Sequence, residues 1–272
     1  MKIGLCYRDF IHEEWIDEIF PNIDFIEIMP DITSIETMNR LIDLSEKHKV
    51  EIGFHSLKSS LGSPEGVHVP SIDRYYYQYK YCKAKYFSDH VAFSHIQGKY
   101  LSTVKAIPYT KKTIDVLTEN LKFMQKIYTD LILLENITQD KIEETNQFTE
   151  GEFFSNLMKN TDDKIKVMFD VTNAYVTAYN SGISFEKYIS DFPFDDVVCI
   201  HVSGYEISSD EKLRDSHSAN FDHKIIDALR MVLQKCEPEF LLLERDFGAN
   251  SLNDTLVDIE KLREVAAEFV TV

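Results

Sequence analysis

Short apolar runs recur along the chain and alternate with longer segments in which apolar residues return every three or four positions. The short runs are typical of buried strands, and the longer segments are typical of helices that cover a sheet on one face. This pattern predicts eight strands, at Lys2–Tyr7, Phe25–Met29, Val50–Phe54, Tyr86–Phe87, Leu131–Leu134, Lys166–Phe169, Val197–Ile200 and Phe240–Leu243.

Helices are predicted between these strands, and the segment 92–108 is expected to be a loop with some strand character. The predicted helices are Phe10–Ile19, Ser34–His48, Val69–Lys85, Thr110–Tyr128, Gly151–Lys159, Phe185–Phe192, Phe221–Gln234 and Ser251–Val270. Strict alternation of strands and helices indicates a parallel sheet with right-handed crossovers. Eight such units predict a (β/α)8 TIM barrel that forms a single domain over residues 1–272, with an open doubly wound sheet as the alternative.

The charge balance and the glycine pattern exclude several classes of function. The chain of 272 residues carries a formal net charge of −17, so a nucleic acid partner is not expected, because its phosphates would be repelled. No glycine-rich phosphate-binding loop follows a predicted strand, which argues against a nucleotide-binding fold. The four cysteines, at positions 6, 82, 199 and 236, form no C-x-x-C pair, so neither a disulfide framework nor a zinc ribbon is expected.

The sequence shows no targeting signal and no membrane segment. Met1–Gly4 runs directly into a predicted strand, without the apolar region of a signal peptide. No apolar stretch approaches the roughly 20 residues that span a bilayer. A cytoplasmic location without membrane association is therefore expected.

Residues that can bind metal ions stand at the ends of six predicted strands. In a parallel barrel the C-terminal strand ends share one mouth, where active sites lie. The candidate ligands are His55, His90, Glu135, Asp170, Asn173, His201, Asp215, His217 and Glu244. A single histidine at such a position is usually a hydrogen-bonded structural residue, and a single carboxylate is usually a helix N-cap. The repetition at successive strand ends favours metal binding instead, since a cluster of buried carboxylates needs compensating charge.

The number and type of these side chains limit the choice of metal. One ion takes about four to six ligands, so nine groups indicate two or three ions with bridging carboxylates. Imidazole and carboxylate ligands without thiolates suit iron, manganese or zinc. Asp89 and Asp246 are candidates to orient ligand imidazoles from outside, although Asp246 could equally pair with Arg245. The other histidines, at positions 12, 48, 68, 95 and 223, are expected on the surface or in loops.

Several short motifs, taken in order, resemble one known family. They are Ile3–Arg8 (IGLCYR), Phe54–Leu57 (FHSL) with Leu61–Ser63 (LGS), Ser88–His90 (SDH), Leu134–Asn136 (LEN), Phe169–Tyr175 (FDVTNAY), Ile200–Gly204 (IHVSG), Asp215–His217 (DSH) and Leu243–Asp246 (LERD). Together they resemble the multinuclear non-heme iron-dependent oxidative enzymes, a bacterial family long left uncharacterised, and the match covers nearly the whole chain. The second strand departs from the family, because Glu27–Asp31 (EIMPD) lacks the Glu-Asn pair that many relatives have there.

This resemblance implies a TIM barrel that holds two or three iron ions (Fe2+/Fe3+) on the nine residues named above. It implies an oxidoreductase that uses dioxygen to modify a ribosomally made precursor peptide, often at cysteine, as in methanobactin-type biosynthesis. It also implies a small partner protein that binds the leader peptide. Glu135 is expected to bridge two ions, and Glu135, Asp215 and His217 are the candidate catalytic residues.

Two other functions remain open on the residues alone. One is a redox-inert zinc or manganese barrel enzyme, similar to a sugar isomerase or epimerase or to an endonuclease. A sugar isomerase usually needs a lysine among its ligands, and Lys58 and Lys85 do not stand at strand ends. The other is a binding module without chemistry, for which nine converging ligands are excessive.

Overall fold

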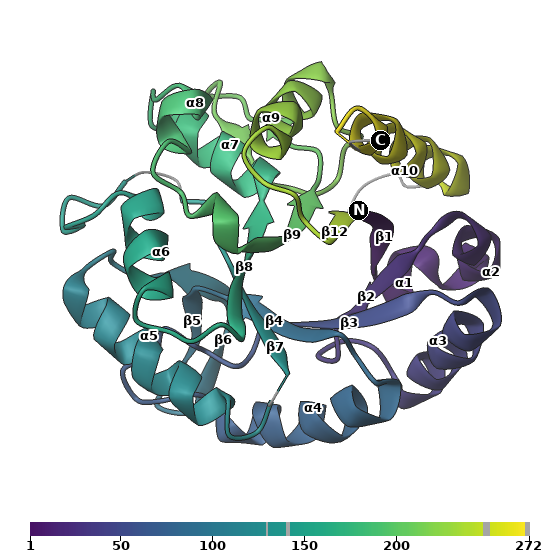
Figure 1. Ribbon diagram of the computed structural model, residues 1–272, viewed down its shortest axis with the longest axis horizontal. Helices are drawn as coiled ribbons and strands as arrows, with labels where there is room; N and C mark the ends of the chain where they lie inside the picture. Colours follow the sequence, from purple (N-terminus) through teal and green to yellow (C-terminus); the bar gives the residue numbers. More distant parts are fainter. Residues whose placement is uncertain (129, 140–141, 247–250, 270–272) are drawn as a thin grey trace.

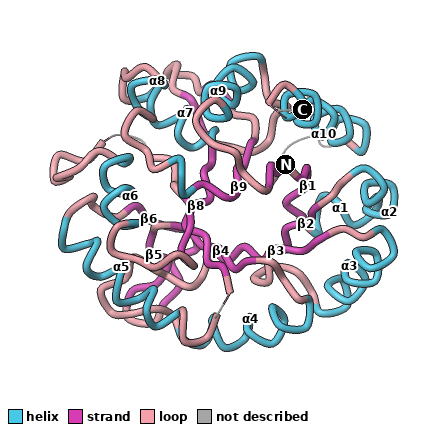
Figure 2. The backbone as a smooth tube through the Cα atoms, viewed as in Figure 1, coloured by secondary structure: helices cyan, strands magenta, loops and turns pink. Residues whose placement is uncertain are grey.

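Eight parallel strands close into a barrel, as the alternating pattern predicts. The computed structural model describes residues 1–128, 130–139, 142–246 and 251–269. Around the barrel the strand order is β1-β12-β9-β8-β7-β4-β3-β2. The strands lie inside a ring of helices, which is the TIM-barrel arrangement (Figures 1 and 2). Their bounds are β1 Lys2–Tyr7, β2 Phe25–Ile28, β3 Glu51–Ser56, β4 Tyr86–His90, β7 Leu131–Glu135, β8 Ile165–Asp170, β9 Val197–Val202 and β12 Phe240–Leu243.

The long helices follow the predicted amphipathic segments closely. Several begin at a side-chain cap, for example Ser34, which accepts a hydrogen bond from the backbone of Thr37 at the start of α3. The predicted end of the last helix, at Val270, lies outside the described residues. The helices are α3 Ile35–His48, α4 Val69–Cys82, α5 Lys111–Met124, α6 Glu150–Met158, α7 Val171–Asn180, α8 Phe185–Tyr188, α9 His223–Leu233 and α10 Leu252–Ala267. In the described part of the chain, none of the helices is both long and apolar enough to cross a membrane.

Four features differ from the prediction. Helix α7 was not predicted, and it begins directly at the end of β8. The expected helix Phe10–Ile19 is broken into α1 (Asp9–His12), a 3-10 turn and α2 (Ile16–Ile19), because the backbone of Trp15 leaves the helical region. The expected loop 92–108 contains an antiparallel hairpin of β5 (Ala92–Ile96) and β6 (Lys99–Ala106). A second, shorter hairpin joins β10 (Glu206–Ile207) to β11 (Leu213–Arg214).

The core has two layers, one between barrel and helices and one inside the barrel. The inner layer is small and consists of Cys6, Phe25, Tyr86, Leu133, Met168, Cys199, Phe240 and Leu242. Gly53 of β3 makes room in this layer, since a Cβ there would lie 2.5 Å from the ring of Tyr86. The phenol of Tyr86 can therefore cross the barrel beneath the mouth, a position that matters for the site above it.

Candidate metal centre

Parallel register brings the predicted ligands to one level of the barrel. His90 on β4 lies directly opposite Glu135 on β7, and Asp170 on β8 lies opposite His201 on β9. Each of these residues is the last or nearly the last residue of its strand, so its side chain reaches the C-terminal mouth. Glu244 follows β12 immediately. All of these side chains except that of His90 are almost completely buried.

A first group consists of His55, His90 and Glu135. Oε2 of Glu135 lies 3.3 Å from Nε2 of His55 and 3.2 Å from Nε2 of His90. Among the described residues this oxygen has no aligned hydrogen-bond partner, although it is buried. One oxygen and two imidazole nitrogens thus converge without an aligned hydrogen bond between them. That arrangement suits ligands of a shared ion better than a hydrogen-bonded network.

A second group shares Glu135 with the first. Its other oxygen, Oε1, lies 3.1 Å from Nδ1 of His201, and the same nitrogen lies 3.2 Å from Oε2 of Glu244. Ligand atoms of Glu135, Asp170, His201 and Glu244 all lie within 4.8 Å of one another. The two oxygens of Glu135 therefore face two different groups of ligands, which is the geometry expected of a bridging carboxylate.

A third group shares Glu244 with the second and adds His217 and Asp246. Nδ1 of His217 lies 3.6 Å from Oε2 of Glu244 and 3.4 Å from Oδ2 of Asp246. Asp246 was expected either to orient an imidazole or to pair with Arg245. It contacts the imidazole of His217 and pairs with the buried Arg8, whereas Arg245 contacts Asp258.

Arg8 is the buried cation of this cluster. Its guanidinium donates to Oε1 of Glu244 and to Oδ1 of Asp246, each at 2.6 Å. Burial opposes the charge of Arg8, but the two carboxylates outweigh it and raise its pKa. Arg8 thus binds one oxygen of each carboxylate. The other oxygens, Oε2 of Glu244 and Oδ2 of Asp246, face His217.

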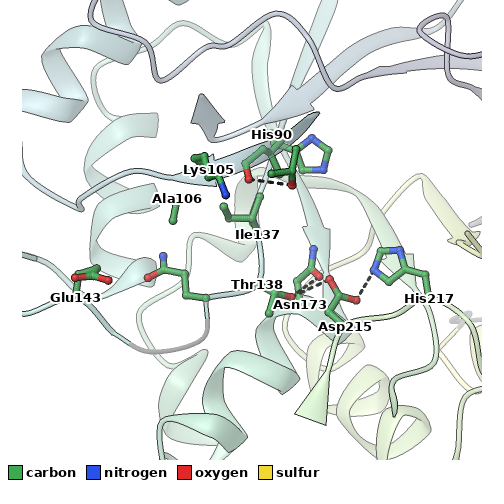
Figure 3. A pocket seen from close by; sticks show the side chains of 12 residues that line it. His90, Lys105, Ala106, Ile137, Thr138, Glu143, Asn173, Asp215 and His217 are labelled. Carbon is green, nitrogen blue, oxygen red and sulfur yellow. Dashed lines mark hydrogen bonds and ion pairs between the residues drawn. The ribbon is translucent and has the colours of Figure 1, made fainter. Parts of the chain in front are cut away.

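Asn173 and Asp215 lie beside the third group, on the wall of an open cavity (Figure 3). The hydroxyl of Thr138 connects them, at 2.7 Å from Oδ1 of Asn173 and 2.9 Å from Oδ2 of Asp215. Oδ1 of Asp215 lies 2.5 Å from Nε2 of His217. The cavity has a volume of about 430 Å³, and residues 103–106 of β6 form its opposite wall. The structure therefore brings all nine predicted residues to the mouth. Four of them line the cavity: His90, Asn173, Asp215 and His217.

The pKa values show a cluster that lacks positive charge. Burial, together with the charges of Asp215 and Glu135, raises the pKa of Asp170 well above its usual value. Burial disfavours the imidazolium of His90, yet nearby Glu135 and Asp89 raise its pKa to about 9. Carboxylates likewise raise the pKa of His217 against the effect of burial. Besides the guanidinium of Arg8, protonated imidazoles are therefore the counter-charges available in the absence of metal.

Glu27 was missed as a site residue because it lies inside a strand and not at its end. It is completely buried on β2, and its carboxylate lies 3.2 Å from Nε2 of His201. The signal was present in the sequence as a charged residue within an otherwise apolar run. The expectation that His12 and His95 are surface or loop residues was wrong. His12 is fully buried and accepts a hydrogen bond from the backbone of Arg8, and His95 is buried within strand β5.

Comparison with known proteins adds a family to this geometry. A family model described as RiPP precursor modification enzyme MbnB/TglH/ChrH matches residues 2–267. A UPF0276 protein of Psychromonas ingrahamii is 23% identical over 274 residues, covering 99% of this chain and 95% of that protein. A UPF0276 protein of Chromobacterium violaceum is 29% identical over 217 residues, covering 79% of this chain and 76% of that protein.

Solved structures share the fold at low sequence identity. A xylose isomerase domain containing protein from Salmonella typhimurium has a TM-score of 0.67 and 12% identity, with 99% of this chain and 97% of that chain covered. The 3-keto-D-glucoside 4-epimerase from E. coli has a TM-score of 0.62 and 12% identity, with 97% of this chain and 99% of that chain covered. At these identities the likeness is evidence for the barrel fold alone.

Proposed function

The chain belongs to the family of RiPP precursor modification enzymes described as MbnB/TglH/ChrH, and from this premise we propose that it is a multinuclear non-heme iron oxidase. Its substrate would be a ribosomally made precursor peptide, modified at cysteine with dioxygen as co-substrate. Membership supports a peptide substrate and confirms the family resemblance drawn from the motifs. The metal, the oxidant and the modified residue are our proposal, which rests on the donor set at the barrel mouth.

The observation that carries the proposal is the chain of three ligand groups linked by shared carboxylates. Glu135 belongs to the first two groups and Glu244 to the last two. We assign metal binding to the nine residues predicted from the sequence, with Asp246 as a further candidate. Buried oxygens of four of these carboxylates have no aligned hydrogen-bond partner among the residues that the structure describes, namely Oε2 of Glu135, Oδ2 of Asp170, Oδ1 of Asp215 and Oε2 of Glu244, although three of them lie close to an imidazole nitrogen. Unsatisfied buried oxygens are costly unless a cation coordinates them.

The balance of charges at the mouth also favours two or three ions. Seven carboxylates lie beside the ligand imidazoles, those of Glu27, Asp89, Glu135, Asp170, Asp215, Glu244 and Asp246, and Arg8 supplies one positive charge. With neutral imidazoles the sum is seven negative charges and one positive charge, or −6. Two divalent ions would bring four positive charges and three would bring six, so two or three ions come close to neutrality. Ligand imidazoles must be neutral to bind a metal, which is consistent with this count.

Bound iron would supply the one-electron steps that reduce dioxygen and break a substrate carbon–hydrogen bond. The residues of the chain have other tasks. Glu135, Asp215 and His217 would hold the reacting ions in place, and the cavity beside Asn173 and Asp215 would admit the peptide. The second ligand group, Glu135, Asp170, His201 and Glu244, is almost entirely buried, so bulk water is kept from it.

Metal analysis tests the proposal directly. The protein would be produced on iron-rich medium, purified without oxygen and analysed for metals, with Mössbauer and electron paramagnetic resonance spectra recorded. At least two irons per chain and a mixed-valent signal are expected. His217→Ala and Glu135→Ala should lose iron and turnover while the fold is kept, as judged by circular dichroism. Stoichiometric zinc with oxygen-independent activity would refute the oxidase and leave the redox-inert barrel enzyme.

A leader-binding partner belongs to the same proposal. The supporting observation is indirect, because an enzyme that modifies a short peptide at a deep centre needs a way to bind the rest of the precursor. A gene for a cysteine-containing precursor and a gene for a small binding protein are expected near this gene. Co-expression of all three should give a complex that is retained on affinity purification. The mass of the modified precursor would then identify the altered residue.

A further inference from the structure

Glu27 is a buried carboxylate directly beneath the candidate metal centre. It lies on β2 inside the barrel and has no exposed surface. Two groups contact its carboxylate: the hydroxyl of Tyr86 donates to Oε2 at 2.7 Å, and Nε2 of His201 lies 3.2 Å from Oε1 and 3.3 Å from Oε2. A buried carboxylate is tolerated only with such partners. Glu27 is therefore not a free acid but part of a fixed contact with His201.

His201 has its two ring nitrogens in opposite surroundings. Nδ1 faces Glu135 and Glu244, at 3.1 and 3.2 Å, within the second ligand group. Nε2 faces the barrel interior below the mouth, where Glu27 lies. A neutral imidazole carries one proton, so only one nitrogen can donate a hydrogen bond while the other offers a lone pair. Which nitrogen is protonated decides whether His201 can bind an ion in the mouth.

We propose that Glu27 is a positioning residue that accepts the Nε2–H of His201 and so leaves Nδ1 free to bind a metal ion in the second ligand group. This inference rests on the proposed function, because it concerns how a metal is held. A carboxylate behind a ligand imidazole fixes its tautomer and ring orientation and increases its basicity. Glu27 is not one of the nine predicted ligands and acts on the metal centre through His201.

The inner layer of the barrel is built around this contact. The phenol of Tyr86 reaches Glu27 across the barrel because β3 carries Gly53 beside its ring. Tyr86 thus holds Oε2 of Glu27 and restrains the carboxylate beneath the imidazole. The phenol reaches the carboxylate from β4 and the imidazole reaches it from β9, so Glu27 is restrained from both sides.

A different use of the same atoms is an ion bound below the mouth. Ligand atoms of Cys6, Glu27 and His201 also lie within 4.8 Å of one another, and Sγ of Cys6 lies 3.6 Å from Nε2. Such an ion would take the Nε2 lone pair, and Nδ1 would then carry the proton. The two arrangements exclude each other for a neutral imidazole, so an experiment can separate them.

The first experiment is an anaerobic titration with Mn2+, followed by calorimetry, on the wild type and three variants. Glu27→Gln removes the charge at nearly constant volume, and we expect the affinity for Mn2+ to fall about 10- to 100-fold. Glu150→Gln is the matched control, since Glu150 is also buried and accepts hydrogen bonds from the phenols of Tyr109 and Tyr188, as Glu27 does from the phenol of Tyr86. This control should bind Mn2+ as the wild type does. Because a glutamine amide can still accept the Nε2–H, Glu27→Leu is titrated in addition, and unchanged affinity in Glu27→Leu would overturn the inference.

The second experiment needs no variant and therefore survives a folding defect in either Glu27 variant. The wild-type protein would be produced with nitrogen-15 labelled histidine and loaded with Zn2+. Its nitrogen-15 NMR spectrum should show Nε2 of His201 protonated and Nδ1 bound to metal. Metal on Nε2 would overturn the inference and favour the ion at Cys6, which Cys6→Ser would then abolish. If the wild type takes up neither Mn2+ nor Zn2+, the metal centre itself is refuted. If it takes up both and only Glu27 proves irrelevant, the proposed function stands.

Discussion

His55 is held by a contact on each of its ring nitrogens. Nδ1 lies 2.9 Å from Oγ of Ser88, and the hydroxyl of Ser88 donates its own proton to the carbonyl oxygen of Phe54 at 3.0 Å. The hydroxyl can therefore only accept from Nδ1, which places the imidazole proton there. Nε2 is then left with its lone pair directed towards Glu135, as a metal ligand requires.

We predict that Ser88→Ala weakens metal binding about 10-fold without preventing folding. The variant removes the acceptor of Nδ1–H, so the tautomer and the ring orientation of His55 are no longer fixed. Anaerobic Mn2+ titration measures the effect. Ser94→Ala is the matched control, because buried Ser94 lies 3.0 Å from Nδ1 of His95, which is not a candidate ligand. Equal losses in both variants would contradict a specific role for Ser88.

Glu150 predicts a pH effect that is independent of the metal centre. Burial raises its pKa to about 7 against an ordinary value of 4.5, although Tyr109 and Tyr188 lower it through hydrogen bonds. The folded protein therefore holds a proton on Glu150 between pH 4.5 and 7 that the unfolded chain releases. Because only the folded state binds this proton, the free energy of unfolding decreases as the pH rises from 4.5 to 7, by up to about 3 kcal/mol.

Urea unfolding of the wild type and Glu150→Gln at several pH values measures this effect. The stability of the variant relative to the wild type should increase between pH 4.5 and 7 and stay constant above pH 7. Taking the difference between the two proteins cancels the titration of the carboxylates and imidazoles in the barrel mouth. A difference that does not change with pH would show that Glu150 is ionised throughout.

At the level of residues, the sequence predicted the convergence of those candidate ligands that stand where an apolar run stops. His55, Glu135 and His201 are examples, because their place at a strand end follows from a change in hydrophobicity. Arg8 and Glu27 were not recognised as part of the site. Their roles depend on which side chains face each other across the closed barrel, and a linear pattern does not contain that information.

Helix α7 shows where prediction of elements from the sequence fails. Its ten residues, VTNAYVTAYN, are rich in β-branched and aromatic side chains, which favour strands. Seven of them are buried, so the segment lacks the polar face that marks an amphipathic helix. The bounds of strand β6 were not predicted for the opposite reason. None of its residues is buried, so no apolar run marks it in the sequence. Buried strands such as β1 and β12 were predicted to the residue.

Asp170 combines two tasks at the junction of β8 and α7. Its Oδ1 accepts the backbone N–H of Asn173 at 2.6 Å and caps the helix, while Oδ2 has no hydrogen-bond partner among the residues described. The cap brings Asn173 into the first turn of α7. One side chain thus places a second candidate ligand while its other oxygen stays available for a metal ion.

Two substitutions separate these tasks. Asp170→Asn keeps a capping oxygen, and we expect the metal-free protein to be at least as stable as the wild type, since burial disfavours the charge of Asp170. Asp170→Ala loses the cap and should be about 1 kcal/mol less stable than Asp170→Asn. Both variants should lose metal. Equal stability of the two variants in urea, measured with a chelator present, would contradict the capping role.

On the scale of the whole molecule, the closed barrel concentrates negative charge at one end. The parallel strands and the segments after them bring carboxylates from separate parts of the chain to one end of the barrel, where the sum of −6 is balanced only partly by protons on imidazoles. Like charges at close range destabilise the folded state unless counter-ions bind. The metal-free protein should therefore be less stable than its core of buried apolar side chains would otherwise allow.

We predict that divalent transition metals stabilise the protein strongly and specifically. A ligand that binds only the folded state adds about 2.7 kcal/mol at a concentration 100 times its dissociation constant, so the melting temperature should rise when Fe2+ or Mn2+ is added anaerobically and fall again with a chelator. Sodium chloride at equal ionic strength should have little effect, because screening cannot satisfy buried oxygens. Glu135→Ala should lose most of the metal-dependent shift, since Glu135 contributes an oxygen to each of two ligand groups. An equal shift in wild type and variant would mean that the ions bind elsewhere on this acidic protein.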